Sequence, residues 1–452
     1  MAIHFRPLDF LQPFSLLRYR SLLSAAQWWP PERVRQFQMK RLQAVLRHAE
    51  SRVPFYRAAW TRPGLRAADL RTPEDLARWP LLSKNQVRRH APELTASNAR
   101  RFWPSAVSST GSTGPPTTVL LDRSTNLLEF AFYWRHWGWF GYRLGDRFAQ
   151  LSWSEFSGPS ASHPTRTQPG TGRLMLNARA LSHERVAAFA GAMCRHRTRF
   201  LKGHPSALLH VALFIRSAGL DIPPLRAVFS TGEVLEPGMR TVIQEVFQAP
   251  VADAYGTMER VVAACECPAG RMHLNADYGC WELIDEPPDP GSGRRLARVV
   301  GTGLHNFSMP LVRYETGDLV EADGPPGPCP CGRSLPTIGR LLGRSVDAIV
   351  TPEGRVVTVA AIVFNIAPAI VQGQLVQEDL DRINVRVLPT PAFGADAERR
   401  LVEEVRSLVG PSMKIVVERV ADPGAFGSPG TKHRAVVSSV YQRIIAAGTP
   451  LP

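Results

Sequence analysis

Strand-like and helix-like runs alternate through the middle of the chain, and this alternation restricts the fold more than any other sequence feature. The runs lie at residues 147–153, 184–195, 207–217, 227–230 and 238–247. Such alternation predicts a layered α/β architecture. Between Trp281 and Val320, short strand patterns separated by glycine and proline predict a β-rich subregion.

Two helices are expected before this region. Leucine and valine recur at helical spacing between Glu32 and Arg57, which predicts an amphipathic helix that ends at Pro54. A second helix, largely apolar, is expected at 127–140. These helices are expected to support the fold.

The length of the chain predicts two domains. At 452 residues it is too long for one ordinary hydrophobic core but suits a large domain with a smaller one attached. Beyond Gly343 the pattern restarts with new strands and a helix at 398–409. We therefore expect an α/β fold, with a large N-terminal domain of layered sheets and helices over residues 1–343 and a small C-terminal α+β domain over residues 344–452.

The charge of the chain favours anionic partners. The formal net charge is +15, and only five of the 54 basic residues are lysines. This balance indicates an attraction for nucleotides, coenzyme A or acidic membrane lipid. Nucleic acid is not expected as a partner, because no basic run or nucleic-acid motif accompanies the charge.

The N-terminal segment carries no expected signal peptide, since Asp9, Gln12 and Arg18 interrupt its apolar runs. We therefore expect a cytoplasmic protein. Apolar and basic residues mix after Leu11, so this segment is expected either to touch a membrane surface as a peripheral contact or to pack on its own domain. The apolar segment 356–376 is interrupted by polar residues and proline, and it is expected to be buried core because a membrane span needs about 20 predominantly apolar residues.

The segment Ser108-Ser-Thr-Gly-Ser-Thr-Gly-Pro-Pro-Thr117 concentrates hydroxyl groups and glycines in a loop. Glycines let a backbone approach polyphosphate closely, and amides and hydroxyls donate hydrogen bonds to phosphate oxygens. The segment is not a Walker A loop, because Gly-Lys-Ser/Thr is missing. A Ser/Gly-rich surface turn is the structural alternative.

Three further motifs follow the loop in order. They are Tyr255-Gly-Thr-Met-Glu259, Arg313-Tyr-Glu-Thr-Gly-Asp318 and Gly339-Arg-Leu-Leu-Gly-Arg-Ser-Val-Asp347. Together with the loop they resemble the motifs of the adenylate-forming superfamily, specifically its phenylacetate-coenzyme A ligase branch and the related proteins encoded in capsule loci. The resemblance covers nearly the full chain. Taken singly, each motif also has a structural explanation as core, turn or solvated surface.

The resemblance implies a nucleotide-binding role for these residues. ATP would be bound by Ser109, Thr110, Gly111, Ser112, Thr113, Gly114, Tyr255, Gly256, Thr257, Asp318 and Arg344. In the family pattern the tyrosine lies near the adenine, and the aspartate accepts hydrogen bonds from the ribose hydroxyls, which suits a carboxylate. Glu259 would help to hold Mg²⁺ and phosphate. Asp347 would be the hinge about which the small domain moves.

A lysine near the C-terminus resembles the catalytic lysine of the family. Lys432 lies in Ser428-Pro-Gly-Thr-Lys432, and an ammonium group can stabilise the charge that grows on the transferring phosphoryl group. Two features depart from the family pattern. Thr431 separates the glycine from the lysine, and Pro115 stands where many relatives have lysine after the last loop glycine. A solvated surface lysine is the alternative for Lys432.

The cysteines lie in two clusters that predict a structural zinc site. Cys267 and His273 lie in one stretch, and Cys329 and Cys331 lie in another. A Cys₃His set matches tetrahedral Zn²⁺, and some members of the resembled branch carry such a site. Cys265 is an alternative to Cys267, and isolated buried cysteines are the structural alternative to zinc.

The implied reaction joins a small-molecule carboxylic acid to ATP, giving acyl-AMP and pyrophosphate. The acyl group would then pass to coenzyme A, as in the relatives, or to a carrier-protein thiol, an amine or a sugar hydroxyl. The segments 201–206 and 230–233 correspond to the acyl pocket of relatives, and their composition favours an aromatic or otherwise apolar acid. A non-catalytic homologue that acts in polysaccharide or natural-product assembly is the rival hypothesis. A monomer or homodimer is expected.

Overall fold

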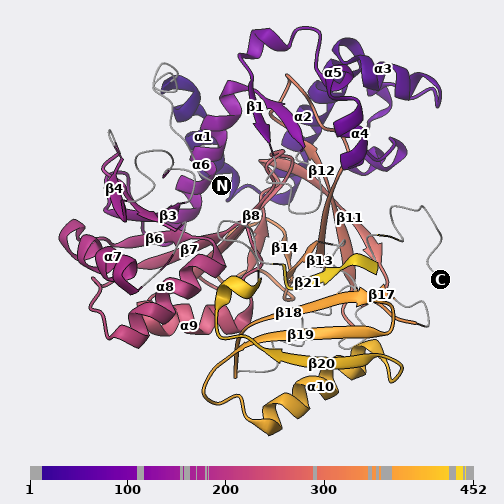
Figure 1. Ribbon diagram of the computed structural model, residues 1–452. Coiled ribbons are helices and arrows are strands. Elements are labelled where there is room, and N and C mark those ends of the chain that lie inside the picture. The colour runs from indigo at the N-terminus through magenta and orange to yellow at the C-terminus, as the bar shows by residue number, and fades with distance from the viewer. Residues whose placement is uncertain are drawn as a thin grey trace. The chain divides into compact units, whose positions relative to one another are not determined.

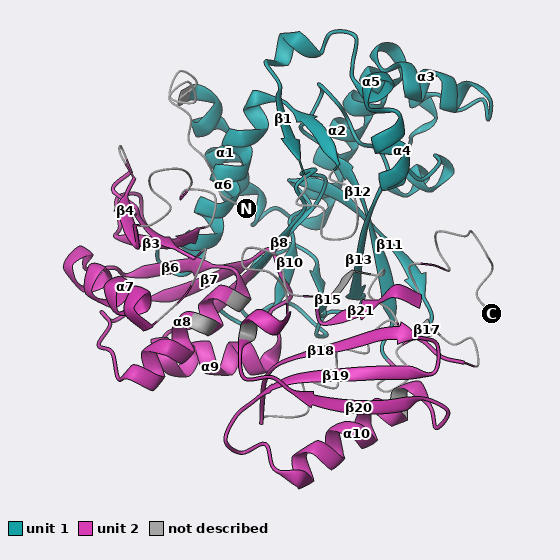
Figure 2. Ribbon diagram, in the orientation of Figure 1, with its two compact units in different colours: residues 1–142, 254–287, 294–341 teal, residues 143–253, 288–293, 342–452 magenta. Residues whose placement is uncertain are grey.

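The computed structural model describes residues 13–108, 117–152, 156, 163–168, 171–178, 181, 183–288, 293–344, 349–352, 356–357, 369–426, 434–440 and 443. Their contacts divide the chain into two compact units (Figure 2). The first contains residues 1–142, 254–287 and 294–341, and the second contains 143–253, 288–293 and 342–452. One division point lies next to the predicted domain boundary, but residues 143–253 group with the C-terminal part. The predicted domains 1–343 and 344–452 stay a prediction, since contact grouping is a different property from independent domain movement.

The first unit combines helices with strands (Figure 1). Its helices are α1 (Pro13–Ala26), α2 (Pro31–Arg52), α3 (Pro54–Thr61), α4 (Lys84–Arg89), α5 (Ala91–Leu94) and α6 (Arg123–Trp139), with 3-10 turns η2 (Ala67–Asp69), η3 (Pro73–Arg78) and η4 (Ala99–Phe102). Its strands are β1 (Ser105–Ser108), β2 (Thr118–Leu121), β9 (Ala263–Glu266), β10 (Met272–Leu274), β11 (Gly279–Glu286), β12 (Leu296–Gly303), β13 (Tyr314–Glu321) and β14 (Thr337–Ile338). Strand β8 (Val251–Gly256) ends in this unit, and β15 (Leu341–Arg344) begins in it.

Strand pairing in the first unit is antiparallel. Strands β14, β10, β9 and β8 are successive neighbours in one sheet. Strands β11, β12 and β13 are successive neighbours in a second sheet, of order β11-β12-β13-β15. This sheet contains the β-rich subregion expected from the sequence. The amphipathic helix predicted from Glu32 ends before Pro54, as expected, and a further helix begins at this proline, because proline is tolerated in the first turn of a helix but not in its interior. Helix α2 therefore ends at Arg52, and α3 begins at Pro54.

The second unit contains the alternating elements expected from the sequence. They are β3 (Phe148–Ser152), β4 (Thr165–Thr167), β5 (Leu174–Asn177), α7 (His183–His196), β6 (Phe200–Gly203), α8 (Pro205–Ala218), β7 (Ala227–Thr231) and α9 (Pro237–Phe247). Strands β7, β6, β3 and β5 are successive parallel neighbours, and β4 pairs antiparallel with β5. Phe148, Phe200 and Phe229 stack on successive strands, with ring centroids 6.0–6.4 Å apart. The layered α/β prediction is confirmed.

The C-terminal part of the second unit has its own small sheet. Its elements are β16 (Ile349–Val350), β17 (Val356–Val357), β18 (Ile370–Asp379), β19 (Arg382–Pro389), α10 (Ala395–Val409), β20 (Lys414–Arg419), the 3-10 turn η7 (Pro423–Phe426) and β21 (Val436–Ser438). The order β20-β19-β18-β21 mixes parallel and antiparallel pairs, and α10 contributes apolar side chains to its core. This is the α+β composition expected there.

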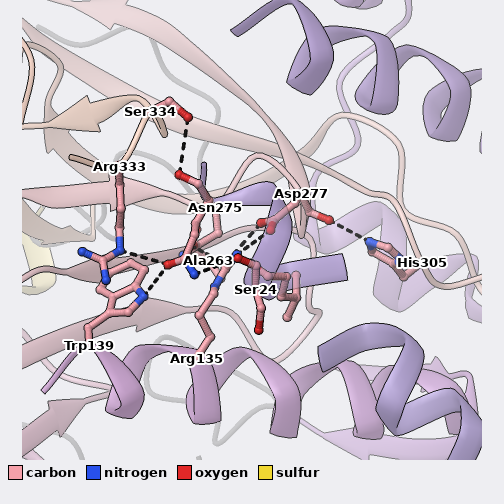
Figure 3. A network of polar contacts seen from close by, with 11 residues as sticks. Ser24, Arg135, Trp139, Ala263, Asn275, Asp277, His305, Arg333 and Ser334 are labelled. Carbon is pink, nitrogen blue, oxygen red and sulfur yellow. Dashed lines mark hydrogen bonds and ion pairs between the residues drawn. The ribbon is translucent and has the colours of Figure 1, made fainter. Parts of the chain in front are cut away.

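A buried polar network supports the β9–β10 hairpin of the first unit (Figure 3). The Arg135 guanidinium forms an ion pair with Asp277 at 2.5 Å, and the two side chains are 3% and 1% exposed. Its second terminal nitrogen donates to Asn275 Oδ1 at 2.7 Å, and Asn275 Nδ2 donates to the carbonyl oxygen of Ala263 at 3.2 Å. The network therefore joins α6 to strand β9 and to the turn after β10. Within the described part of the chain, no helix is both long and apolar enough to cross a bilayer.

Candidate functional site

The motif YGTME at the end of β8 and the motif RYETGD at the start of β13 contact each other. The phenol of Tyr255 donates a hydrogen bond to Asp318 Oδ2 at 2.6 Å. A second bond joins the same motifs, because the phenol of Tyr314 donates to Glu259 Oε1 at 2.8 Å. Burial, followed by the charge of Asp318, raises the pKa of Tyr255 well above its ordinary value. This phenol therefore stays a hydrogen-bond donor at neutral pH.

A bulge in β13 brings Asp318 to this position. Arg298 of β12 pairs with Leu319, whereas Val300 pairs with Glu315, so β13 has extra residues between these two pairs. Such bulges re-aim side chains. Gly317 lies in the bulge with φ +77°, a conformation that side chains disfavour. The positive φ of Gly317 therefore explains why glycine occupies this position of the TGD sequence.

The remainder of the YGTME motif forms a tight turn. Gly256 pairs with Ala263 across β8 and β9. The carbonyl of Thr257 accepts from the Arg260 amide at 3.1 Å, and Arg260 has φ +54°. The Arg260 guanidinium donates to Asn126 Oδ1 at 2.7 Å. The turn is thus fixed to the start of α6, and Glu259 lies within it.

Several predicted site residues lie outside the described residues. These are Ser109, Thr110, Gly111, Ser112, Thr113, Gly114, Asp347 and Lys432. Arg344 lies at the end of β15, but its side chain also falls outside the description. The loop at 109–116 is flanked by described strands, since β1 and β2 pair up to Ser108 and Thr118. Their hydroxyls are hydrogen-bonded at 2.8 Å.

The four predicted metal ligands lie together. The ligand atoms of Cys267, His273, Cys329 and Cys331 are all within 4.8 Å of one another. The Sγ atoms of Cys267 and Cys329 are 3.6 Å apart, and Cys331 Sγ is 3.3 Å from His273 Nε2. A tetrahedral site with Zn–S of about 2.3 Å and Zn–N of about 2.1 Å has ligand separations of about 3.8 Å and about 3.6 Å. The observed spacing therefore fits a tetrahedral metal ion.

The surroundings of the cluster orient its histidine. His273 Nδ1 lies 2.9 Å from the carbonyl oxygen of Leu335, so it donates there and leaves Nε2 for a metal, as ligating histidines commonly do. Burial lowers the pKa of His273, which favours the neutral imidazole that binds metal. Among the described residues, the cluster includes Cys267 and not Cys265, which pairs opposite His273 in the ladder between β9 and β10.

The two segments predicted to line an acyl pocket also meet in the second unit. Gly232 has φ +87°, and a Cβ added there would lie 2.6 Å from His204 Cε1. His204 directly precedes α8. The imidazole and the glycine backbone are therefore in close contact, although the two segments are far apart in sequence.

Tyr314 was not predicted from the sequence as a site residue, although the structure brings it to Glu259. Its bond to Glu259 links the motifs YGTME and RYETGD, yet in the sequence it is only the residue between Arg313 and Glu315. The signal was present, since Tyr314 and Asp318 both belong to the quoted motif RYETGD. The contact itself depends on the register of two strands.

Several characterised proteins are similar in sequence over most of the chain. A phenylacetate-coenzyme A ligase from Pseudomonas putida is 26% identical over 344 residues, which cover 73% of this chain and 75% of that protein. Another from Thermus thermophilus is 26% identical over 403 residues and covers 83% and 86%. Protein CapK from Staphylococcus aureus is 23% identical and covers 59% of each chain. No family model matches the chain.

Solved structures share the fold. A 2-hydroxyisobutyryl-CoA ligase in its postadenylation state, in complex with 2-HIB-AMP, has a TM-score of 0.71 at 20% identity and covers 94% of this chain and 95% of that one. The same ligase in complex with R3-HIB-AMP has a TM-score of 0.70 at 22% identity and covers 93% of each chain. The chain is therefore similar in sequence to phenylacetate-coenzyme A ligases over most of its length, and it shares the fold of the 2-hydroxyisobutyryl-CoA ligase.

Proposed function

We propose that this chain is an ATP-dependent ligase that activates a carboxylic acid as acyl-AMP and transfers the acyl group to coenzyme A. The observation that carries the proposal is the pair of hydrogen bonds, Tyr255 to Asp318 and Tyr314 to Glu259, that joins two nucleotide motifs. The sequence relatives named phenylacetate-coenzyme A ligase support the reaction class.

The described residues have distinct proposed roles in the first step. Asp318 accepts hydrogen bonds from the ribose hydroxyls while Tyr255 holds one of its oxygens. Glu259 is the proposed ligand for Mg²⁺, and its position is fixed by Tyr314. The metal, when bound, would offset negative charge on the phosphates. Lys432 is proposed to approach the transferring phosphoryl group, and the small domain is proposed to move about Asp347 before acyl transfer.

The test is acid-dependent release of pyrophosphate. The chain is incubated with ATP, Mg²⁺ and a panel of aryl and fatty acids, and coenzyme A is then added to detect a thioester. Asp318→Asn should raise the KM for ATP by about tenfold, because a hydrogen bond to a charged group contributes about 1.5–3 kcal/mol. Asp323→Asn is the matched control, since Asp323 is exposed and pairs only distantly with Arg295, at 3.5 Å. Absence of acid-dependent pyrophosphate release across the panel would refute the proposal.

A non-catalytic homologue remains the second candidate function, and Pro115 and Thr431 favour it. Pro115 removes a positive charge from the predicted phosphate loop, and Thr431 shifts the lysine relative to the common pattern. ATP binding without turnover, unchanged by Lys432→Ala, would support this candidate. Thioester formation that Lys432→Ala abolishes would exclude it. If pyrophosphate is released but no thioester forms, the acceptor is proposed to be an amine, a sugar hydroxyl or a carrier-protein thiol.

We also propose a structural Zn²⁺ bound by Cys267, His273, Cys329 and Cys331. The support is the donor set and its spacing within 4.8 Å. The proposed metal ties the β9–β10 hairpin to the loop before β14 and has no open position for chemistry.

Other predicted properties stay predictions with direct tests. Phe14 and Leu17 on α1 are 83% and 56% exposed, and Arg18 beside them is exposed, which supports a peripheral contact with acidic lipid. Co-sedimentation with anionic vesicles tests that contact. A cytoplasmic location and a monomeric or homodimeric state are tested by cell fractionation and by sedimentation velocity.

A further inference from the structure

Arg313 opens the RYETGD motif, yet its side chain is turned into the protein. Its side chain is only 9% exposed, and its guanidinium forms an ion pair with the Glu282 carboxylate, with Nη2–O and Nε–O distances of 2.8 and 2.9 Å. Its remaining terminal nitrogen, Nη1, donates to the carbonyl oxygens of Ala77 and Trp79. All three nitrogens therefore have protein partners. A planar guanidinium has enough N–H donors to bind a carboxylate and two carbonyl oxygens at the same time.

The backbone of Arg313 is held in an unusual conformation. Its φ is +51°, and a residue with a side chain in this region costs of order 1 kcal/mol or more. Bonds on both sides of the residue maintain it. Its amide donates to Thr302 Oγ1 at 2.9 Å, and its carbonyl accepts from the Leu82 amide at 2.9 Å. Such strain persists where the surrounding contacts determine the conformation.

The same contacts set the register of the motif that follows. Leu82 lies parallel to Tyr314 in an isolated bridge, and the Leu82 carbonyl accepts from the Glu315 amide at 3.0 Å. Arg313 and Leu82 thus fix the start of β13. From this start the strand carries Tyr314 to Glu259 and Asp318 to Tyr255.

The Leu82 segment also leads to the end of the predicted phosphate loop. Helix α4 begins two residues after Leu82, and Arg88 on this helix donates from Nε to Thr117 Oγ1 at 2.9 Å. Thr117 is the first described residue after the loop. The segment that includes Leu82 and α4 therefore contacts both the start of β13 and the residue that follows the predicted phosphate loop.

We propose that Arg313 is a positioning residue for nucleotide binding, which acts through β13 and the Leu82 segment rather than by touching the nucleotide. The inference rests on the proposed adenylation function. A direct role for its guanidinium is disfavoured, because Glu282, Ala77 and Trp79 already occupy it. The geometry instead links the ion pair between Arg313 and Glu282, through the start of β13, to the position of Asp318.

The test is a double-mutant cycle on the affinity for MgATP, measured by isothermal titration calorimetry with the full chain and no acid present. Arg313→Lys replaces the guanidinium by a single point charge that cannot keep all three partners. We expect the affinity to fall about tenfold, which is about 1.4 kcal/mol, in the range of coupled neighbouring residues. In the Asp318→Asn background the same change should lower the affinity less than about threefold, because the contact that Arg313 positions is already impaired.

Two controls separate positioning from general structural damage. Arg295→Lys alters another arginine, which directly precedes β12, is 49% exposed and pairs with the exposed Asp285 and Asp323. It should leave the ATP affinity within about twofold, because exposed ion pairs contribute little. If Arg313→Lys does not fold, Glu282→Gln replaces it in the cycle, since the arginine and its bonds to the carbonyls are retained. Equal losses from Arg313→Lys in both backgrounds, or an equal loss from Arg295→Lys, would overturn the inference. If the wild-type chain does not bind MgATP, the proposed function fails and the inference with it.

Discussion

Replacing Asp277 by alanine should be among the most destabilising single changes in the first unit. In the network of Figure 3, Asp277 Oδ2 and Oδ1 accept from Arg135 Nη1 and Nη2 at 2.5 and 3.3 Å. Once the carboxylate is removed, the guanidinium keeps only the carbonyl of Leu23 and the amide oxygen of Asn275. Both side chains of the ion pair are nearly inaccessible, so water cannot replace the lost partner.

The magnitude follows from this burial. Removing one partner of a buried ion pair costs about 3–5 kcal/mol, and a unit of this size loses about 2–4 °C in Tm per kcal/mol. Asp277→Ala should therefore lower the Tm by about 6–20 °C, measured by circular dichroism and by urea titration. The matched control is Glu74→Gln, because Glu74 pairs with Arg35 at a similar distance of 2.9 Å, but the side chains are 57% and 62% exposed.

The Glu74→Gln control tests whether burial sets the size of the stability loss. An exposed pair contributes about 0–1 kcal/mol, so Glu74→Gln should leave the Tm almost unchanged. Replacing both buried partners, with Arg135→Met and Asp277→Leu together, should recover most of the loss, since no unpaired charge then remains. Equal small effects of Asp277→Ala and Glu74→Gln would refute the claim that burial sets the magnitude.

Two further predictions concern the metal and the response to acid. Elemental analysis of the purified wild-type chain should find one zinc ion per chain. Cys329→Ser should lose this zinc, whereas Cys194→Ser should keep it, because Cys194 is an exposed cysteine outside the cluster. Retention of zinc in Cys329→Ser would contradict the proposed ligand set. Burial, followed by the charge of Arg41, lowers the pKa of His305 from 6.5 to about 3. The native state therefore keeps this imidazole neutral while the unfolded chain protonates it below pH 6.5, so the free energy of unfolding should fall by about 1.4 kcal/mol per pH unit between pH 6.5 and 3. In urea titrations at several pH values, His305→Gln should remove the contribution of one proton from the pH dependence of the free energy of unfolding. An unchanged pH dependence would exclude His305 as its source.

The sequence predicted the elements better than their contacts. The helical spacing at 184–195 and 207–217 became α7 and α8, because an amphipathic period depends on neighbouring residues only. The contact grouping of residues 143–253 with residues 342–452 was not predictable. It depends on apolar side chains such as Val371 and Leu388, which join the core cluster that contains Leu201.

The grouping of the four proposed metal ligands was predictable for a different reason. Two short segments each supply two possible ligands, three thiols and one imidazole in all, and these residue types restrict the metal chemistry. The choice between Cys265 and Cys267 was not available from the sequence, because both precede His273 at short spacing. The ladder resolves it, since Cys265 is paired within β9 while Cys267 follows the strand end and lies in the cluster.

The nucleotide motifs show where sequence reasoning reaches its limit. A motif such as RYETGD groups residues that are adjacent in the chain, but the folded strand gives them different partners. Arg313 and Glu315 form ion pairs, whereas Tyr314 and Asp318 bind residues 55 and 63 positions away along the chain. These pairings require a bulge and a left-handed residue at defined places, and neither follows from residue type alone. We therefore propose that Arg313, the first residue of this motif, acts on nucleotide binding without facing the nucleotide, and the double-mutant cycle at Arg313 and Asp318 tests this separation of roles.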